Sequence, residues 1–257
     1  MAGDLPKVVH EVAGRPMVSW VVDACRAAGV ERCVAVVGYR SGLVKAALAE
    51  FGPYVQFVEQ AEQLGTGHAA RMAQPLFEGL GDRDVFVLAG DGPLIRAATL
   101  DAVLTRHRAV SAAATLATAV IPDPAGYGRV VRDAHGQFVT IVEQKDATPD
   151  QLAIREVNPS YYCFNAAALF AALGQVRNDN RQREYYLTDV PALLKAAGRA
   201  VAVEPAVPPE DVLSINTPQQ LAEVDAILRA RLAAEGAPTR GGDPGAAVDR
   251  RTQGASA

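Results

Sequence analysis

Short apolar runs alternate, in the first half of the chain, with segments whose apolar positions recur at helical spacing. Residues 33–37 and 84–89 are continuous apolar runs, a pattern typical of parallel strands covered on both faces. A third strand is predicted at 55–58. The segments with helical spacing are 16–28, 41–48 and 68–77, and Ser41 is a candidate cap for the second of these. This alternation predicts an α/β fold, a Rossmann-like doubly wound sheet that is mixed but mainly parallel, with helices on both faces.

The second half of the chain has a different pattern. Strands are predicted at 112–120, 157–164 and near Val201, and a hairpin at 128–132 and 137–142. Helices are predicted at 166–173, 188–197 and 218–234. From Glu235 onward almost no apolar residue occurs, so 235–257 is expected to be a disordered tail behind a single domain of residues 1–234.

Composition narrows the classes of function. The chain has 257 residues, 49% of them hydrophobic, and a net charge of -4, which argues against non-specific nucleic-acid binding. Its three cysteines are scattered through apolar runs, and its four histidines lack the spacing of a zinc site. No apolar run reaches the length of a membrane span, and a cytoplasmic location is expected.

Two polar residues could hold a metal ion. Asp91 directly follows the apolar run 84–89, at the sheet edge where such folds bind ligands, and a carboxylate oxygen there suits magnesium. Asp91 could equally be a turn residue that bonds to its own backbone. Asn216 precedes the last predicted helix, where asparagine or threonine caps are commonplace.

Two further features could contact a nucleotide. In the loop 60–67, Gly65 and Gly67 would let the backbone approach a ligand, and the amide of Gln60 could recognise a base. The same loop could be a plain connector whose threonine caps the next helix. Lys7 could place a point charge on phosphate, or it could be an ordinary surface lysine.

The order and combination of these motifs resemble one known family. The chain is similar to the uridylyltransferase (pyrophosphorylase) domains of bacterial UDP-N-acetylglucosamine-forming enzymes, from Met1 to about Leu228. The matching stretches are Asp4-Leu-Pro-Lys-Val-Val-His10, Gln60 to Ala69, Gly90-Asp-Gly-Pro-Leu-Ile95, Gly126-Tyr-Gly-Arg-Val130, Ile141-Val-Glu-Gln-Lys-Asp-Ala147, Glu184-Tyr-Tyr-Leu-Thr-Asp189 and Asn216. The fold implied is that of the nucleotide-diphospho-sugar transferases.

The resemblance also implies roles. Lys7 would bind the phosphates of UTP, and Asp91 and Asn216 would hold Mg²⁺. Gln60 and Gly65 would select uracil, with Thr66 near the nucleoside. The residues expected near N-acetylglucosamine 1-phosphate are Gly128, Glu143, Asn158 and Thr188 at the sugar, and Lys145 at its phosphate. The implied reaction is an in-line displacement that forms UDP-N-acetylglucosamine and pyrophosphate.

The chain departs from the family pattern at its start. Family members begin with a strand and a glycine-rich phosphate loop, L-A-A-G-x-G-T-R-M, and Met1 falls at the methionine of that motif. We expect a mis-assigned start codon rather than a true truncation. A chain that lacks this first strand and loop is expected to have little or no activity. The C-terminal β-helix acetyltransferase domain of bifunctional members is also not found, so its trimer is not expected, and the oligomeric state is not indicated.

Two local departures affect the expected site. The family's Asn-Thr-Gly at the sugar is Asn158-Pro-Ser here, which leaves the preference for N-acetylglucosamine open. Gly92 replaces a residue that usually has a side chain, so a looser loop is expected after Asp91. Two alternatives remain: a related nucleotidyltransferase with another sugar or base, and a non-catalytic nucleotide-sugar-binding remnant.

Overall fold

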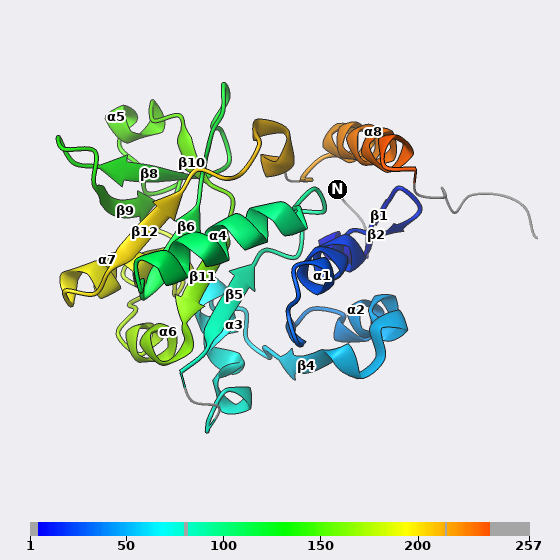
Figure 1. Cartoon of the computed structure of the whole chain (residues 1–257), viewed down its shortest axis with the longest axis horizontal. Coiled ribbons are helices and arrows are strands. Elements are labelled where there is room, and N and C mark those ends of the chain that lie inside the picture. Colours follow the sequence, from blue (N-terminus) through cyan, green and yellow to red (C-terminus); the bar gives the residue numbers. More distant parts are fainter. Residues whose placement is uncertain (1–4, 80–81, 214, 237–257) are drawn as a thin grey trace, which may run out of the picture.

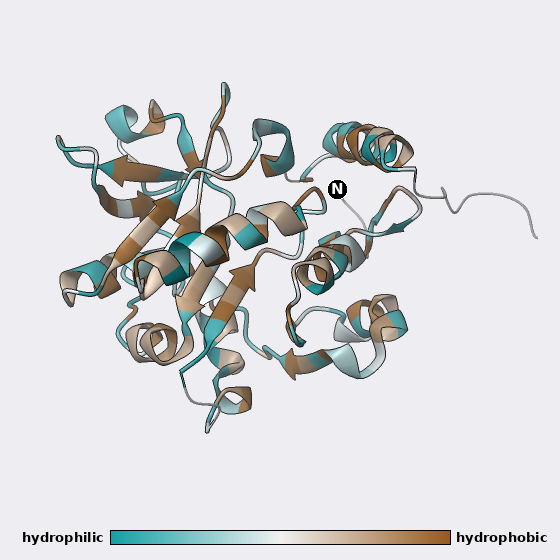
Figure 2. Ribbon diagram, in the orientation of Figure 1, coloured by the Kyte–Doolittle hydropathy of each residue, from teal (hydrophilic) through white to brown (hydrophobic). Residues whose placement is uncertain are grey.

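The computed structural model describes residues 5–79, 82–213 and 215–236. Residues 237–257, most of the tail that is expected to be disordered, lie outside the described residues. Residues 1–4, which include Asp4 of the first motif, lie outside them as well. Figure 1 shows a sheet in the middle of the molecule with helices on either side, and the apolar residues of Figure 2 are concentrated on its strands. The predicted α/β class, a mixed sheet with helices on both faces, is confirmed.

The central sheet has the strand order β12-β6-β11-β5. Its strands are β5 (Asp84–Leu88), β6 (Ala114–Ala117), β11 (Tyr161–Asn165) and β12 (Val201–Glu204). β12 runs parallel to β6, whereas β11 is antiparallel to both β5 and β6. The strand β11 is buried on both faces, and its alternation divides the core into two layers.

Helices cover both faces of this sheet. Tyr161 and Cys163 of β11 pack with the buried side chains of α1 (Met17–Ala27) and α4 (Ala97–Ala109). The intervening Tyr162 and Phe164 pack against α6 (Ala166–Leu173). On that same side lie α7 (Val190–Ala196), behind the short 3-10 helix η4 (Leu187–Asp189), and α3 (Thr66–Met72), followed by η3 (Gln74–Leu76).

A smaller parallel pair stands beside the central sheet. β3 (Cys33–Val37) pairs with β4 (Val55–Glu59) and is flanked by α2 (Ser41–Ala47) and η2 (Ala49–Tyr54). Within the described residues, β3 pairs with β4 alone and β5 pairs with β11 alone. The cap expected from Ser41 is wrong: Arg40 is the N-cap residue of α2, with φ 50°, and no side chain caps this end.

Two predicted strands are each divided between two sheets. The segment 112–120 breaks into β6 and β7 (Ala119–Val120), and 157–164 breaks into β10 (Glu156–Asn158) and β11. Ser160 has φ 64° at the second break, which turns the chain from one sheet to the next. The second sheet is antiparallel with order β7-β10-β8-β9, in which β8 (Gly128–Arg132) and β9 (Phe138–Val142) form the predicted hairpin.

The C-terminal helix closes the fold against the N-terminal segment. α8 (Pro218–Ala234) begins at a capping box formed by Thr217 and Gln220. It packs beside β1 (Glu11–Val12), which pairs with β2 (Arg15–Pro16), as Figure 1 shows. The remaining short elements are η1 (Lys7–Val9), α5 (Pro149–Leu152) and η5 (Pro209–Val212).

Candidate active site

Lys7 brings two of the predicted ligand residues together. Its Nζ donates to Oδ2 of Asp91 at 2.5 Å and to Oδ1 of Asn216 at 2.7 Å, although the three residues are far apart in sequence. The side chains of Lys7 and Asp91 are 33% and 27% exposed, so a ligand can reach this point. The lysine is therefore part of a polar cluster, which favours the functional interpretation over that of an ordinary surface lysine.

Local structure explains why these side chains converge. Asp91 lies in the turn after β5, and Lys7 begins η1. Thr217 rather than Asn216 caps α8: its hydroxyl accepts from the backbone N–H of Gln220 at 3.1 Å. The helix is therefore capped without the Asn216 side chain, whose amide oxygen accepts a hydrogen bond from Lys7.

The Asp91 and Asn216 oxygens fit a divalent cation. Both converge on a single positive charge, the Lys7 ammonium, within hydrogen-bonding distance. No group of three or more His, Cys, Asp or Glu residues that could hold a metal occurs in the part of the chain that the structure describes. One carboxylate and one amide oxygen suit Mg²⁺ when phosphate oxygens and water complete its shell.

A cleft of about 1330 Å³ lies beside this cluster and contains several predicted site residues. Lys7, Thr66, Glu143 and Thr188 all line it. Its walls include the whole of β3 and β5, together with apolar side chains of α1 and α6. Residues from both halves of the chain therefore face one cavity.

The glycines of the 60–67 loop approach protein backbone. A Cβ added at Gly65, where φ is +109°, would lie 2.6 Å from the Tyr185 carbonyl oxygen, and one at Gly67 would lie 2.9 Å from it. These glycines let this loop pack against the Glu184–Asp189 segment, and their close approach to a ligand stays a prediction. Two of the matched motifs are in direct contact.

Gln60 and Thr66 are held by this packing. The Gln60 amide donates to the Gly65 carbonyl at 3.1 Å and lies 2.9 Å from Nδ1 of His68. The Thr66 hydroxyl accepts from the backbone N–H of Leu187 at 3.0 Å, while Gly65 occupies the N-cap of α3. Thr66 therefore joins α3 to η4 and does not cap its own helix.

A buried carboxyl lies on the far wall of the cleft. Glu143 accepts a hydrogen bond from the Thr188 hydroxyl at 3.1 Å, and burial raises its pKa above the ordinary range. A Cβ at Gly128 would lie 3.8 Å from the Glu143 carboxylate, so these two residues are neighbours. Three of the four predicted sugar residues are thus adjacent.

Asn158, the fourth, is 4% exposed and held inside the protein. Its amide donates to the Tyr162 hydroxyl at 2.6 Å, and its Oδ1 accepts from the Ser160 N–H at 3.3 Å. Tyr162 itself lines the cleft. Asn158 ends β10 and is therefore extended, the conformation that a following proline favours.

The turn after Asp91 is tightly packed. A Cβ at Gly92 would lie 2.2 Å from the hydroxyl oxygen of Tyr161, whose side chain is fully buried. The looser loop expected from Gly92 is therefore wrong. Glycine is needed here because the tyrosine ring fills the space of a side chain.

Comparison with known families now decides what kind of domain this is. A profile of the MobA-like NTP transferase domain matches residues 1–200, most of the chain. The chain belongs to this family. It is 49% identical over 232 residues to the bifunctional protein GlmU of Pelotomaculum thermopropionicum. The aligned residues make up 90% of this chain and 50% of that protein.

Other relatives agree with this assignment. Bifunctional protein GlmU of Alkaliphilus oremlandii is 43% identical over 91% of this chain and 50% of its own length. That of Brevibacillus brevis is 44% identical over 90% of this chain and 50% of its own length. The chain spans about half the length of these curated relatives. Among the described helices, none is both long and apolar enough to cross a membrane.

Lys145, which was predicted to contact the sugar phosphate, does not line the cleft beside Lys7. It lines a separate hollow of about 780 Å³ with Arg129, Arg181 and Gln182, and its ammonium donates to the Gln182 side chain. The structure does not bring it to the Lys7 cluster, and its contact with a sugar phosphate remains a prediction.

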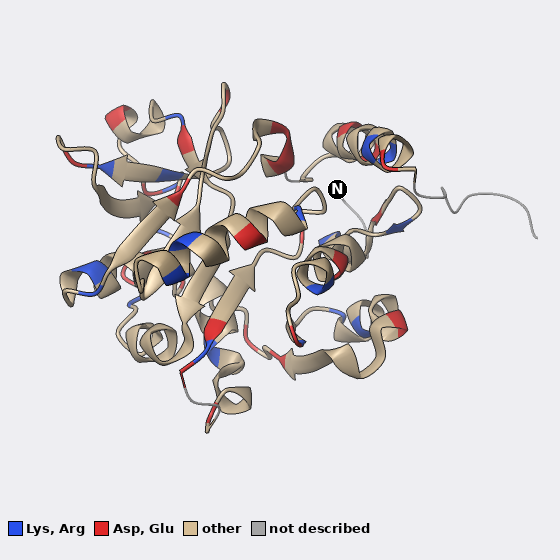
Figure 3. Ribbon diagram, viewed as in Figure 1, with Lys and Arg blue, Asp and Glu red and all other residues tan. Residues whose placement is uncertain are grey.

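The sequence did not indicate the buried residues that contact and support the predicted site residues and the turn after Asp91. Tyr161, Tyr162 and Asp211 were not singled out. Tyr161 and Asp211 act through partners distant in sequence, Gly92 and Arg96, whereas Tyr162 bonds to Asn158 across the break between β10 and β11. The sequence offers one signal, a charged Glu210-Asp211 pair directly after two prolines and just before Asn216. In Figure 3, positively and negatively charged residues are interspersed along the ribbon.

Proposed function

We propose that this domain transfers a uridylyl group from UTP to N-acetylglucosamine 1-phosphate, forming UDP-N-acetylglucosamine and pyrophosphate. The observation that carries the proposal is the convergence of Lys7, Asp91 and Asn216 beside a cleft lined by Thr66, Glu143 and Thr188. Membership of an NTP transferase family and the resemblance of the motifs support it. A cytoplasmic location and the absence of a nucleic-acid partner remain predictions.

The reaction is a single displacement at phosphorus. A phosphate oxygen of the sugar 1-phosphate forms a bond to the α-phosphorus of UTP while the bond from this phosphorus to the bridging oxygen breaks, and pyrophosphate leaves. Lys7 would lower the charge on the reacting phosphates, a point-charge role that suits an ammonium group. Asp91 and Asn216 would hold Mg²⁺, which supplies further charge neutralisation when bound.

The other predicted residues, in the cleft and beside it, would position the two substrates. Gln60, Gly65 and Thr66 would contact the uracil nucleoside from the loop that packs on the 184–189 segment. Gly128, Glu143, Asn158 and Thr188 would contact the sugar. Because such reactions depend on alignment, rigid support of these groups contributes to rate.

The proposal is tested by measuring pyrophosphate release with a panel of nucleoside triphosphates and sugar 1-phosphates. The protein is expressed both as these 257 residues and with any in-frame codons upstream of Met1. We expect the highest kcat/KM with UTP and N-acetylglucosamine 1-phosphate in Mg²⁺. A higher value with another sugar or base would redefine the substrate. Tight binding of UDP-N-acetylglucosamine without turnover in either form would contradict the transferase and favour a binding module.

A further inference from the structure

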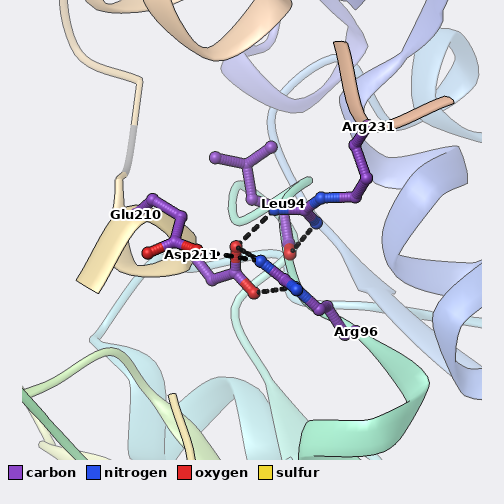
Figure 4. Close-up of polar contacts among 5 residues, drawn as sticks. All are labelled: Leu94, Arg96, Glu210, Asp211 and Arg231. Atoms are coloured by element: carbon purple, nitrogen blue, oxygen red, sulfur yellow. Dashed lines mark hydrogen bonds and ion pairs between the residues drawn. The ribbon is translucent and has the colours of Figure 1, made fainter. Parts of the chain in front are cut away.

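A buried carboxylate lies behind the Lys7 cluster and outside the cleft. Asp211 in η5 is 0% exposed, and its Oδ2 accepts from Arg96 Nε at 2.5 Å. Its Oδ1 accepts from a second Arg96 nitrogen at 3.1 Å and also from Arg231. Figure 4 shows both guanidinium groups converging on this one carboxylate. A fork of this kind fixes direction as well as distance.

The ion cluster joins the two chain segments that carry Asp91 and Asn216. Arg96 ends the segment that begins with Asp91, immediately before α4, and Asp211 is five positions before Asn216. Arg231 comes from α8, and its other nitrogen donates to the Leu94 carbonyl at 2.8 Å. Every link therefore runs between the Asp91 turn, η5 and α8 (Figure 4).

Apolar packing supports the same segments from beside the ion cluster. Leu94 and Ile215 are each 0% exposed and belong to one buried cluster that includes Val224 and Leu228 of α8. Leu94 lies three positions after Asp91, and Ile215 directly precedes Asn216. Small shifts of either segment would be resisted because close-packed interiors transmit strain.

We propose that Asp211 is a positioning residue for the divalent-metal site. Through Arg96 and Arg231 it holds the Asp91 turn and the Asn216 segment at the separation at which both side-chain oxygens face one cation. This inference rests on the proposed function, because it concerns how the site binds its metal and nucleotide. Replacing a group that hydrogen-bonds to a metal ligand and orients it typically weakens metal binding by about 10–100-fold.

The test uses Mn²⁺ as a paramagnetic probe, titrated into protein saturated with UDP-N-acetylglucosamine, with free Mn²⁺ measured by electron paramagnetic resonance. We expect Asp211→Asn to weaken Mn²⁺ binding by about 10-fold or more. In the transferase assay the same variant should need more Mg²⁺ for half-maximal rate, with little change in KM for the sugar phosphate. Arg231→Lys, which keeps the charge but loses the guanidinium that donates to both Asp211 and the Leu94 carbonyl, should show a smaller change in the same direction.

A matched control is Glu156→Gln. Glu156 accepts two hydrogen bonds from Arg132 at 2.6 Å in the antiparallel sheet, so this variant also breaks a forked ion pair, away from Lys7. We expect it to lower the melting temperature while leaving Mn²⁺ affinity at the wild-type value. The contrast separates loss of an ion pair from loss of metal positioning.

The outcomes distinguish the two proposals. If the wild-type protein binds the nucleotide sugar and Mn²⁺ but the Asp211 variant binds Mn²⁺ within about twofold of wild type, the positioning role is wrong and the proposed function stands. If Asp211→Asn does not fold, Arg231→Lys decides by the same criterion. If the wild-type protein binds neither ligand, the proposed function fails and this inference fails with it.

Discussion

At the scale of single residues, the structure gives each predicted group a partner that explains its position. Lys7 holds Asp91 and Asn216, Thr188 donates to Glu143, and Asn158 donates to Tyr162. The sequence predicts which residues matter, because the motifs resemble a known family. It does not predict the direct Lys7 contacts, which depend on segments more than 80 positions apart.

Asp91→Asn should affect turnover far more than stability. The ion pair with Lys7 is partly exposed, and such pairs contribute about 0–1 kcal/mol to the free energy of unfolding. Loss of the only carboxylate in the cluster should lower kcat by about 10²-fold or more. Steady-state kinetics and thermal unfolding of the same preparation measure both quantities. A variant that is strongly destabilised but keeps the wild-type kcat would refute this role.

Gly92→Ala should destabilise the fold, because its methyl group would lie 2.2 Å from the buried Tyr161 hydroxyl. Overpacking of this kind costs about 1–3 kcal/mol. The control is Gly42→Ala in α2, where no atom lies within 4 Å and alanine should stabilise the helix by about 0.5–1 kcal/mol. Urea unfolding compares the two variants, and equal stabilities would mean that Gly92 is not confined by Tyr161.

Glu143→Gln should change the dependence of stability on pH. Burial raises the pKa of Glu143 in the folded protein, so ionisation of this carboxyl disfavours folding. This penalty is absent below about pH 4, grows as the pH rises through the raised pKa, and is complete above it. The melting temperature of the variant should therefore gain on that of wild type between about pH 4 and pH 8. A difference that stays constant across this range would contradict the buried, ionisable glutamate.

At the scale of elements, local signals predict helices better than sheet partners. The segments 166–173 and 218–234 are helices with the predicted bounds, and in the structure the side chains of Asn165 and Thr217 cap them. The predicted strands 112–120 and 157–164 are each split between two sheets. An apolar run shows that a strand is buried, but it carries no signal for the sheet to which each part belongs.

The contact between the 60–67 loop and the 184–189 segment leads to a prediction for Gly65→Ala. The added methyl would lie 2.6 Å from the backbone oxygen of Tyr185, at a φ of +109°. We expect both lower stability and weaker binding of UDP-N-acetylglucosamine, because Gln60 and Thr66 lose their support. Gly198→Ala is the control, since φ is +71° but no atom lies within 4 Å of the added Cβ, and Gly198 does not line the cleft. Calorimetric titration should show weaker binding for Gly65→Ala alone, and equal affinities would contradict the coupling.

At the scale of the whole molecule, residues from two parts of the chain meet at the proposed site. Lys7 and Thr66 come from the first half, and Glu143, Thr188 and Asn216 come from the second. They meet because η1, the Asp91–Arg96 segment after β5 and α8 pack together while η4 packs on α3. The family resemblance predicts the fold class and the members of the site. The interface between the halves, including the Asp211 ion cluster, is visible only once the chain is folded.

Phosphorus-31 nuclear magnetic resonance of a mixture of UTP, N-acetylglucosamine 1-phosphate and Mg²⁺ directly detects the proposed uridylyl transfer. It is recorded with wild-type protein and with Asp91→Asn, each expressed with and without in-frame sequence upstream of Met1. We expect at least one wild-type form to convert both substrates to UDP-N-acetylglucosamine and pyrophosphate in equal amounts, and the matching Asp91→Asn form to be far slower. Unchanged substrate signals with every wild-type form, or equal rates for wild type and Asp91→Asn, would contradict it.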